Sequence, residues 1–92
     1  MRPSPLYDIP STVMLQKVDD ETLLFDSETG SFFNLNYIGT IMWEVIAENT
    51  SIITVYKELQ KIFDIPEKQL QTDLLAFSKA LHAQGLLIIK SL

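Results

Sequence analysis

The stretch SFFNLNYIGTIMW, residues 31–43, decides the fold, because its apolar pattern changes from that of a strand to that of a helix at Asn36. Before Asn36, Phe33 and Leu35 alternate with Phe32 and Asn34, as in a half-buried strand. After it, apolar residues recur on one helical face, at positions 38, 41, 42 and 45. Asn36 itself is a typical helix N-cap residue. We therefore expect this strand and this helix to be packed neighbours, with the rest of the chain folded against them.

The composition predicts one domain without bound metal or cofactor. The chain has 92 residues, of which 47% are hydrophobic, enough for a single core. The absence of cysteine excludes disulfides, thiolate metal sites and thiol nucleophiles, and the single histidine cannot build a metal site alone. No apolar run approaches the roughly 20 residues of a membrane span, so we expect a cytoplasmic protein without a membrane partner.

The charge of the chain argues against a nucleic-acid partner. Its formal net charge is −5, and the seven basic residues are scattered along the sequence. A surface that binds nucleic acid needs clustered lysine and arginine to neutralise phosphates.

The pattern of elements predicts an α+β fold of the winged-helix type, with a three-stranded antiparallel meander followed by three helices. Residues 1–12 contain three of the four prolines and are expected to form an extended arm. A frayed end is favoured over a functional segment, with attachment of the arm to the domain through Leu6, Tyr7 and Ile9 as the alternative. Residues 13–92 form the single domain. Strands are expected at 13–18, 22–26 and 31–35, and helices at 37–48, 54–63 and 66–84. Residues 86–90 are a short strand or an extended tail.

Local residues refine three of these boundaries. Thr54 is expected as the N-cap of the second helix, Pro66 in the first turn of the third, and Gly85 as its stop. Gly39, inside the first helix, indicates that another backbone passes close to it. The acidic turn at 19–21 lacks the ligand spacing of a calcium loop and is interpreted as a solvated turn.

Catalytic arrangements are not apparent in the sequence. Nucleophilic catalysis needs a base held against a hydroxyl or thiol, and the only histidine, His82, lies on a flank of the third helix without a partner motif. We interpret His82 as a surface residue and the protein as one without enzymatic activity.

Two surfaces are candidates for binding. The strand at 31–35 contains no proline or charged residue. It is therefore either a central or covered strand, or an open edge that accepts another strand, and the two interpretations weigh equally. One flank of the third helix carries Asp73, Ala76 and Ala80, whose small side chains leave room for another backbone. Leu75 lies on the opposite flank.

At these positions the sequence resembles the PqqD-like family of leader-peptide recognition domains. The shared pattern is a turn glycine, an aromatic residue, Leu-Asn, a glycine and a tryptophan, found here at Gly30, Phe33, Leu35-Asn36, Gly39 and Trp43. It continues with Asp73, Phe77, Leu81 and Gly85-Leu86, so that the resemblance spans residues 13–89.

The resemblance implies a binding function without catalysis. The leader of a ribosomally made precursor peptide would add as a strand to residues 31–35, with its apolar side chains in a cleft against the third helix. The residues that the resemblance and the surface argument together assign to this site are Phe32, Phe33, Asn34, Leu35, Asp73, Ala76, Phe77 and Ala80.

Within the family, the LNxxGxxxWE form is most similar to the free-standing leader-binding proteins of lasso-peptide pathways. These work with a cysteine-type leader peptidase and an ATP-dependent cyclase. Less favoured alternatives are a PqqD-type peptide chaperone for a radical enzyme, an antitoxin-like structural partner, and a winged-helix DNA-binding regulator. The last has only Lys57 and Lys61 on the second helix to contact DNA.

Overall fold

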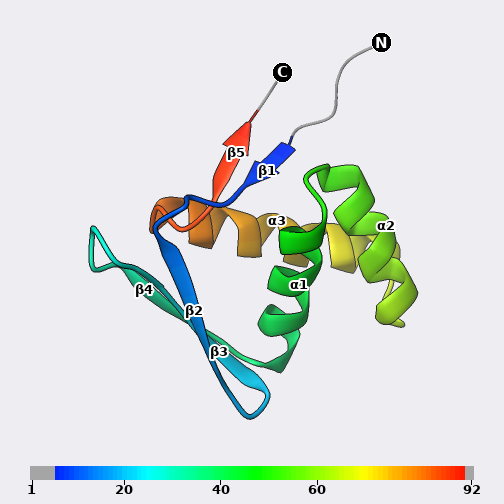
Figure 1. Ribbon diagram of the computed structural model, residues 1–92. Helices are drawn as coiled ribbons and strands as arrows, with labels where there is room; N and C mark the ends of the chain where they lie inside the picture. The colour runs from blue at the N-terminus through cyan, green and yellow to red at the C-terminus, as the bar shows by residue number, and fades with distance from the viewer. Residues whose placement is uncertain (1–5, 91–92) are drawn as a thin grey trace.

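The computed structural model describes residues 6–90 and contains a three-stranded sheet, three helices and a small second sheet (Figure 1). Strands β2 (Val13–Val18), β3 (Glu21–Asp26) and β4 (Phe32–Leu35) form an antiparallel meander in the order β2-β3-β4. The predicted α+β class and meander are confirmed. Because β4 is the last strand of the order, the open-edge interpretation holds and the central-strand alternative is wrong.

The three predicted helices are present, but two of their starts differ: the second begins at Ile52, and the third begins at Glu67, with Pro66 as its N-cap and not in its first turn. They are α1 (Tyr37–Glu48), α2 (Ile52–Ile62) and α3 (Glu67–Ala83). Asn36 caps α1 as expected, since its Oδ1 accepts the Gly39 N–H at 2.8 Å. Thr54 is not the cap of α2. The helix already begins at Ile52, because the Ser51 carbonyl accepts the Val55 N–H at 3.0 Å.

A second sheet joins the two ends of the described chain. Strand β1 (Leu6–Asp8) pairs antiparallel with β5 (Ile88–Lys90) (Figure 1). Tyr7 is only 3% exposed, and its hydroxyl shares a 2.5 Å hydrogen bond with Ser78 Oγ on α3. The preference for a frayed end is therefore wrong for residues 6–8. Residues 1–5 of the predicted arm lie outside the described residues, and the boundary between arm and domain at residue 13 stays a prediction.

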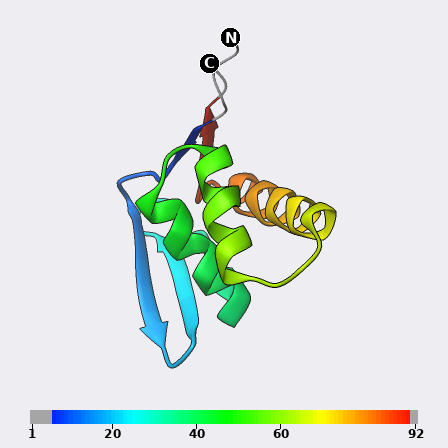
Figure 2. The ribbon, with the colours of Figure 1, turned by 90° about the vertical axis from the view of Figure 1, so that its right-hand side faces the viewer.

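The core lies between the meander and the helices. Figure 2 shows the meander as one layer and the helices as another beside it, with β1 and β5 apart from both at the top. The apolar pattern predicts seven largely buried residues: Phe33, Leu35, Trp43, Leu59, Leu74, Phe77 and Leu81. All of them except the two phenylalanines are buried. Phe33 and Phe77 are only half-buried, and they are the two aromatic residues that line a cleft between the layers. Among residues 6–90, no helix is long and apolar enough to cross a membrane.

Candidate functional site

The open edge of β4 presents the backbone of two particular residues. The Ser31 carbonyl accepts the Asp26 N–H at 2.8 Å, which sets the phase of the antiparallel ladder between β3 and β4. Since backbone groups in such a ladder alternate in direction, those of Phe33 and Leu35 face β3. The N–H and C=O groups of Phe32 and Asn34 therefore face away from β3, toward an edge that no other strand of residues 6–90 occupies.

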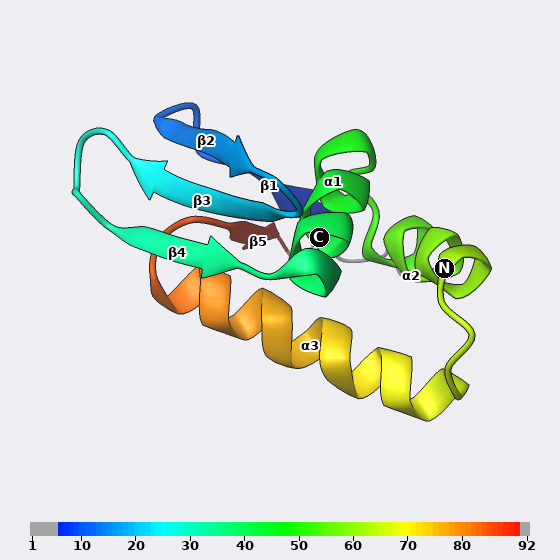
Figure 3. The same ribbon diagram turned by 90° about the horizontal axis from the view of Figure 1, so that it is seen from below.

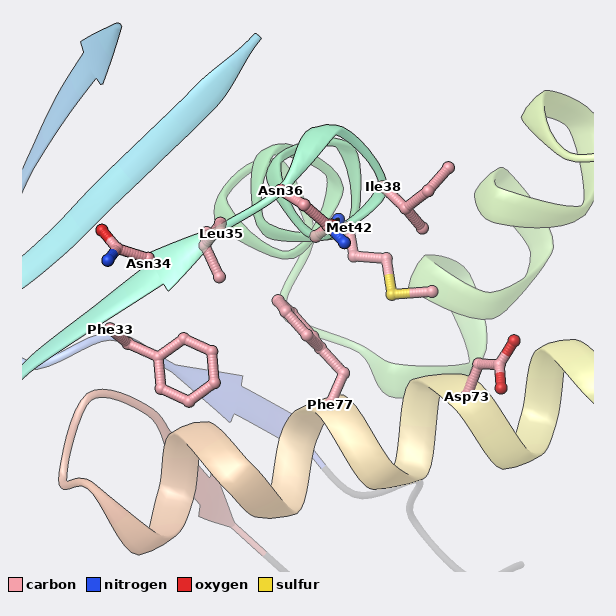
Figure 4. Close-up of a pocket in the computed structure, with 9 residues that line it drawn as sticks. Phe33, Asn34, Leu35, Asn36, Ile38, Met42, Asp73 and Phe77 are labelled. Atoms are coloured by element: carbon pink, nitrogen blue, oxygen red, sulfur yellow. Dashed lines mark hydrogen bonds between the residues drawn. The ribbon is translucent and has the colours of Figure 1, made fainter.

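A cleft of about 320 Å³ lies between this edge and α3. Figure 3 shows α3 running alongside β4. Figure 4 shows the side chains of Phe33 from β4 and Phe77 from α3 in the space between these elements, with Met42 of α1 beside them. The residues that line the cleft are Phe33, Asn34, Leu35, Asn36, Ile38, Gly39, Met42, Asp73 and Phe77. It is thus a cleft with a mixed apolar and polar lining, and its wall includes a strand with free backbone hydrogen-bonding groups.

The absence of a side chain at Gly39 leaves room for the Phe77 ring beside α1. A β-carbon built on Gly39 would lie 3.3 Å from Cε1 of the Phe77 ring and 3.3 Å from Asn36 Oδ1. The expectation that another backbone passes close to Gly39 is therefore wrong, because its neighbour across the cleft is the Phe77 side chain.

Asp73 supplies the only carboxylate among the residues that line the cleft. It is half-buried, and its Oδ1 accepts a hydrogen bond from Gln69 Nε2 at 2.8 Å, one turn earlier on α3. Figure 4 places it at the end of the cleft that Ile38 and Met42 approach from α1. A carboxylate at this position can accept hydrogen bonds from the backbone or a side chain of a bound segment.

The structure brings together five of the eight residues predicted for the site: Phe33, Asn34, Leu35, Asp73 and Phe77. Phe32 points to the opposite face of the sheet, where its side chain is 64% exposed beside its cross-strand neighbour Phe25. Ala76 and Ala80 are not part of the cleft wall. On an α-helix they are rotated by about 60° from Asp73 and Phe77, respectively. Ala76 is exposed and Ala80 is half-buried.

The sequence reasoning missed the contribution of α1. Ile38 and Met42 line the cleft, as do Asn36 and Gly39. Ile38 and Met42 lie one turn apart, and their helix begins directly after β4. This i, i+4 apolar pair next to an edge strand was the available signal. The helical periodicity predicts both residues in the core stripe. Met42 is buried as predicted, whereas Ile38 is exposed.

The remaining candidates for chemistry are isolated. His82 is exposed, and its Nδ1 lies 3.1 Å from the Leu87 carbonyl oxygen, a contact that connects the end of α3 to the chain before β5. Across residues 6–90, no three histidine, aspartate or glutamate side chains are grouped so that they could hold a metal ion.

A comparison with protein families identifies the chain. Residues 21–87 match the family described as coenzyme PQQ synthesis protein D (PqqD). The chain belongs to the PqqD family. The matched segment runs from the start of β3 to the residue before β5, and so contains every residue of the cleft wall.

Solved structures with this PqqD-family fold include two that are described as leader-peptide complexes. One is TbiB1 in complex with the TbiA(β) leader peptide, with a TM-score of 0.79 and 25% sequence identity over 87% of this chain and 93% of that one. The other is lasso peptide synthetase B1 complexed with its leader peptide, with a TM-score of 0.76 and 16% identity over 89% of this chain and 96% of that one. The comparison with curated proteins found no match.

Proposed function

We propose that this PqqD-family protein captures the leader of a precursor peptide by strand addition and presents it to modifying enzymes of the lasso-peptide type. The observation that carries the proposal is the position of the cleft, which lies directly beside the open edge of β4. Two solved proteins of this fold are described as complexes with leader peptides, and both are covered almost completely by this chain. The expected cytoplasmic location is part of the proposal, because precursor peptides are made on ribosomes there.

The backbone of β4 supplies the affinity in this proposal. A leader strand would form its hydrogen bonds with the outward N–H and C=O groups of Phe32 and Asn34. Such bonds demand little of the leader sequence, so selectivity has to come from side-chain pockets. Every second leader side chain would enter the cleft between the Phe33 and Phe77 rings. The carboxylate of Asp73 would accept a hydrogen bond at the end of the cleft.

Of the residues predicted for the site, Ala76 and Ala80 have the weakest support. They lie beside the cleft and not in its wall. They would contact the leader only where it extends past the cleft along α3. Phe32 would contribute through its backbone, because its side chain points to the other face of the sheet.

The protein would act without catalysing a reaction itself. By holding the leader, it would raise the effective concentration of the precursor near a cysteine-type leader peptidase and an ATP-dependent cyclase. We expect the purified protein neither to cleave nor to cyclise a precursor, with or without ATP. Substitution His82→Ala should leave its stimulation of the peptidase intact. If His82→Ala reduced the stimulation as much as omitting the protein does, the result would assign a catalytic role to His82.

A proline scan of the two sheet edges tests strand addition. Asn34→Pro removes an outward N–H from β4 and leaves the ladder with β3 intact. Leu15→Pro is the matched control, because Leu15 lies on β2 at the other edge of the same meander. The Thr12 carbonyl accepts the Ser27 N–H, so the ladder alternation directs the Leu15 N–H outward as well.

The readout is calorimetric titration with a candidate leader peptide from a precursor gene beside the gene of this chain. We expect Asn34→Pro to weaken binding by about 100-fold or more, as loss of an edge hydrogen bond and of strand geometry implies. Leu15→Pro should bind as the wild type does. Equal binding by Asn34→Pro and the wild type, with both folded by circular dichroism, would exclude strand addition at β4.

A second candidate function is that of a peptide chaperone for a radical enzyme, which the family description as a coenzyme PQQ synthesis protein favours. It uses the same cleft and differs only in the enzymes served. Neighbouring genes distinguish the two: peptidase and cyclase genes support the first function, and a radical-enzyme gene supports the second.

A further inference from the structure

A second groove lies on the opposite flank of α3. Its volume, about 450 Å³, exceeds the 320 Å³ of the cleft beside β4. Its walls are α2 and α3, and the pair Tyr7 and Ile89 of the small sheet completes it. None of the residues that line it also lines the cleft beside β4. The two hollows are therefore separate and share only the helix between them.

The groove is rimmed by exposed apolar side chains. Ile53 on α2 is 48% exposed and Leu75 on α3 is 56% exposed, and both line the groove. Tyr56 lies on the α2 wall, half-buried, with its hydroxyl donating to the Glu67 carbonyl at 3.3 Å. Aliphatic and aromatic side chains exposed on both walls of one groove are typical of a surface that another element covers.

The charge around the groove differs in sign from that of the rest of the chain. Residues 52–90, which form α2, α3 and β5, carry five lysines and four carboxylates, a net charge of +1. Residues 6–51 carry one lysine and eight carboxylates, a net charge of −7. Most of the groove therefore lies in the part of the chain whose charges nearly balance, whereas the other part is strongly acidic.

Three of these lysines share helix faces with the exposed apolar residues. Lys57 follows Ile53 by one turn on α2, and Lys79 follows Leu75 by one turn on α3. Lys68 precedes Leu75 by two turns. All three are exposed, and the salt bridges found among residues 6–90 involve the other lysines, Lys17, Lys61 and Lys90.

We propose that this groove binds an amphipathic helix of a partner protein, with apolar residues on one face and carboxylates beside them. A third helix packed on α2 and α3 would bury its apolar face between Ile53, Tyr56 and Leu75. Its carboxylates would meet Lys57 and Lys79 on the two rims. Glu67, whose carbonyl accepts the Tyr56 hydroxyl, would face an end of the helix that carries no carboxylate.

Charge also decides against two other occupants. In a symmetric dimer the same patch meets itself, so the lysine rims of two copies would face each other. The residues of the chain itself that precede β1, at positions 1–5, carry one arginine and no carboxylate. Neither occupant complements the basic rim, whereas an acidic helix does.

The inference adds to the proposed function without depending on it. Because the cleft and the groove lie on opposite flanks of α3, one copy of the protein has room for a leader on one side and a partner helix on the other. A partner bound there would be held at a defined distance from the captured leader.

The test uses two synthetic helical peptides of equal length, with leucines at positions i, i+3, i+4 and i+7. One carries glutamates at the flanking positions and the other carries lysines. Each is titrated into the ¹⁵N-labelled full chain, and amide shifts are followed by NMR. We expect the acidic peptide to shift the amides of Ile53, Tyr56 and Leu75 and the lysine peptide to bind about tenfold more weakly or not at all.

Variants locate the binding and its charge dependence. Leu75→Asp should weaken binding of the acidic peptide by about tenfold, since it replaces an apolar contact on the rim of the groove by a carboxylate that repels the glutamates of the peptide. The double variant Lys57→Glu with Lys79→Glu should reverse the preference between the two peptides. Thr72→Asp, on the exposed face of α3 away from both hollows, is the matched control and should bind as the wild type does.

Four outcomes would overturn the proposal. The first is equal binding of the two peptides, and the second is the absence of amide shifts at millimolar peptide. The third is a set of shifts confined to β4 and the cleft. The fourth is a wild-type dimer in sedimentation that the substitution Leu75→Asp dissociates. Leader titration of Leu75→Asp separates this proposal from the function proposed above. Unchanged leader affinity is expected, and a loss would assign the groove to the leader site.

Discussion

Gly39 and Phe77 meet across the cleft so closely that a β-carbon on Gly39 would lie 3.3 Å from the Phe77 ring. This relationship joins the first turn of α1 to the middle of α3 at the centre of the proposed leader site. Contacts at that distance force the neighbouring group to move, and Phe77 is half-buried and borders the open cleft. The orientation of the Phe77 ring, and with it the shape of the cleft, therefore depends on glycine at position 39.

The first prediction is that Gly39→Ala weakens leader binding with little effect on stability. Alanine gains about 1 kcal/mol of helix propensity over glycine. Crowding against Phe77 and the Asn36 cap costs a similar amount, roughly 1 kcal/mol. The displaced ring should narrow the cleft and lower leader affinity by about tenfold. Urea unfolding and calorimetric titration measure the two effects.

The additional substitution Phe77→Leu provides the control for this prediction. In the Gly39→Ala background a smaller side chain should relieve the crowding and recover part of the affinity. If the two substitutions instead act additively, the contact between these residues does not shape the cleft.

The second prediction is that the two flanks of α3 differ in leader binding. Phe77→Ala removes an aromatic wall of the cleft and should lower leader affinity by about tenfold or more. Leu75→Ala, two residues away, removes a side chain of the groove on the other flank and should leave leader affinity unchanged. The opposite result, a loss with Leu75→Ala alone, would place the leader on the α2 side of α3.

The third prediction concerns acid stability through Asp26. This buried carboxylate accepts the N–H groups of Glu28 at 2.8 Å and Thr29 at 3.3 Å, and the Thr12 hydroxyl at 3.0 Å. The bond from Glu28 is the main reason that the pKa of Asp26 lies below its ordinary value, while desolvation of the carboxyl opposes the shift.

A lowered folded-state pKa stabilises the protein above the unfolded pKa of about 3.9. This contribution is lost as the pH falls through the folded-state pKa. We expect the urea concentration at the unfolding midpoint of the wild type to decrease when the pH is lowered below about 4. The midpoint of Asp26→Asn should be lower than that of the wild type at pH 7 and should change less with acid. Asp20→Asn, at an exposed residue of the β2–β3 turn, is the matched control. Identical acid profiles for the wild type and Asp26→Asn would contradict the assignment.

The fourth prediction concerns the attachment of β1 to α3. Tyr7→Phe removes the hydroxyl that shares a hydrogen bond with Ser78, while Ser78 still donates to the Leu74 carbonyl at 2.7 Å. Because the Ser78 hydroxyl keeps a partner, the loss should be about 1 kcal/mol, the ordinary net value of such a bond. The free energy of unfolding from urea denaturation measures it. A loss above about 3 kcal/mol would mean that the β1–β5 sheet detaches as a unit.

Local features of the sequence determined the elements of this fold. Asn36 caps α1 because its side chain reaches an N–H only three residues away, and this geometry follows from the residue type alone. The meander and the three helices follow from apolar periodicities of two and 3.6 residues, which do not depend on distant contacts. The order of Gly30, Leu35-Asn36, Gly39 and Trp43 was also sufficient to indicate the PqqD family that the comparison confirms.

Contacts between residues far apart in the chain decided the candidate site. Whether β4 is an edge depends on which strands pair with it. The sequence alone favours neither an edge nor a central position, and the strand order β2-β3-β4 decides for the edge. The rotation of α3 placed Asp73 and Phe77 in the cleft and left Ala76 and Ala80 outside it. A stripe of apolar residues defines which face of a helix is buried, but it does not define which flank meets a given neighbour.

The β1–β5 sheet shows the same limit most clearly. Tyr7 and Ile89 are paired although 82 positions of the chain separate them. Three-residue strands carry too little pattern to reveal such a pair. Their pairing arises because Tyr7 is buried against α3 and the chain turns back after Gly85, so the tertiary structure alone brings them together. For this protein, local physical chemistry determined the meander and the three helices, whereas long-range packing determined the β1–β5 pair and the two hollows on either side of α3.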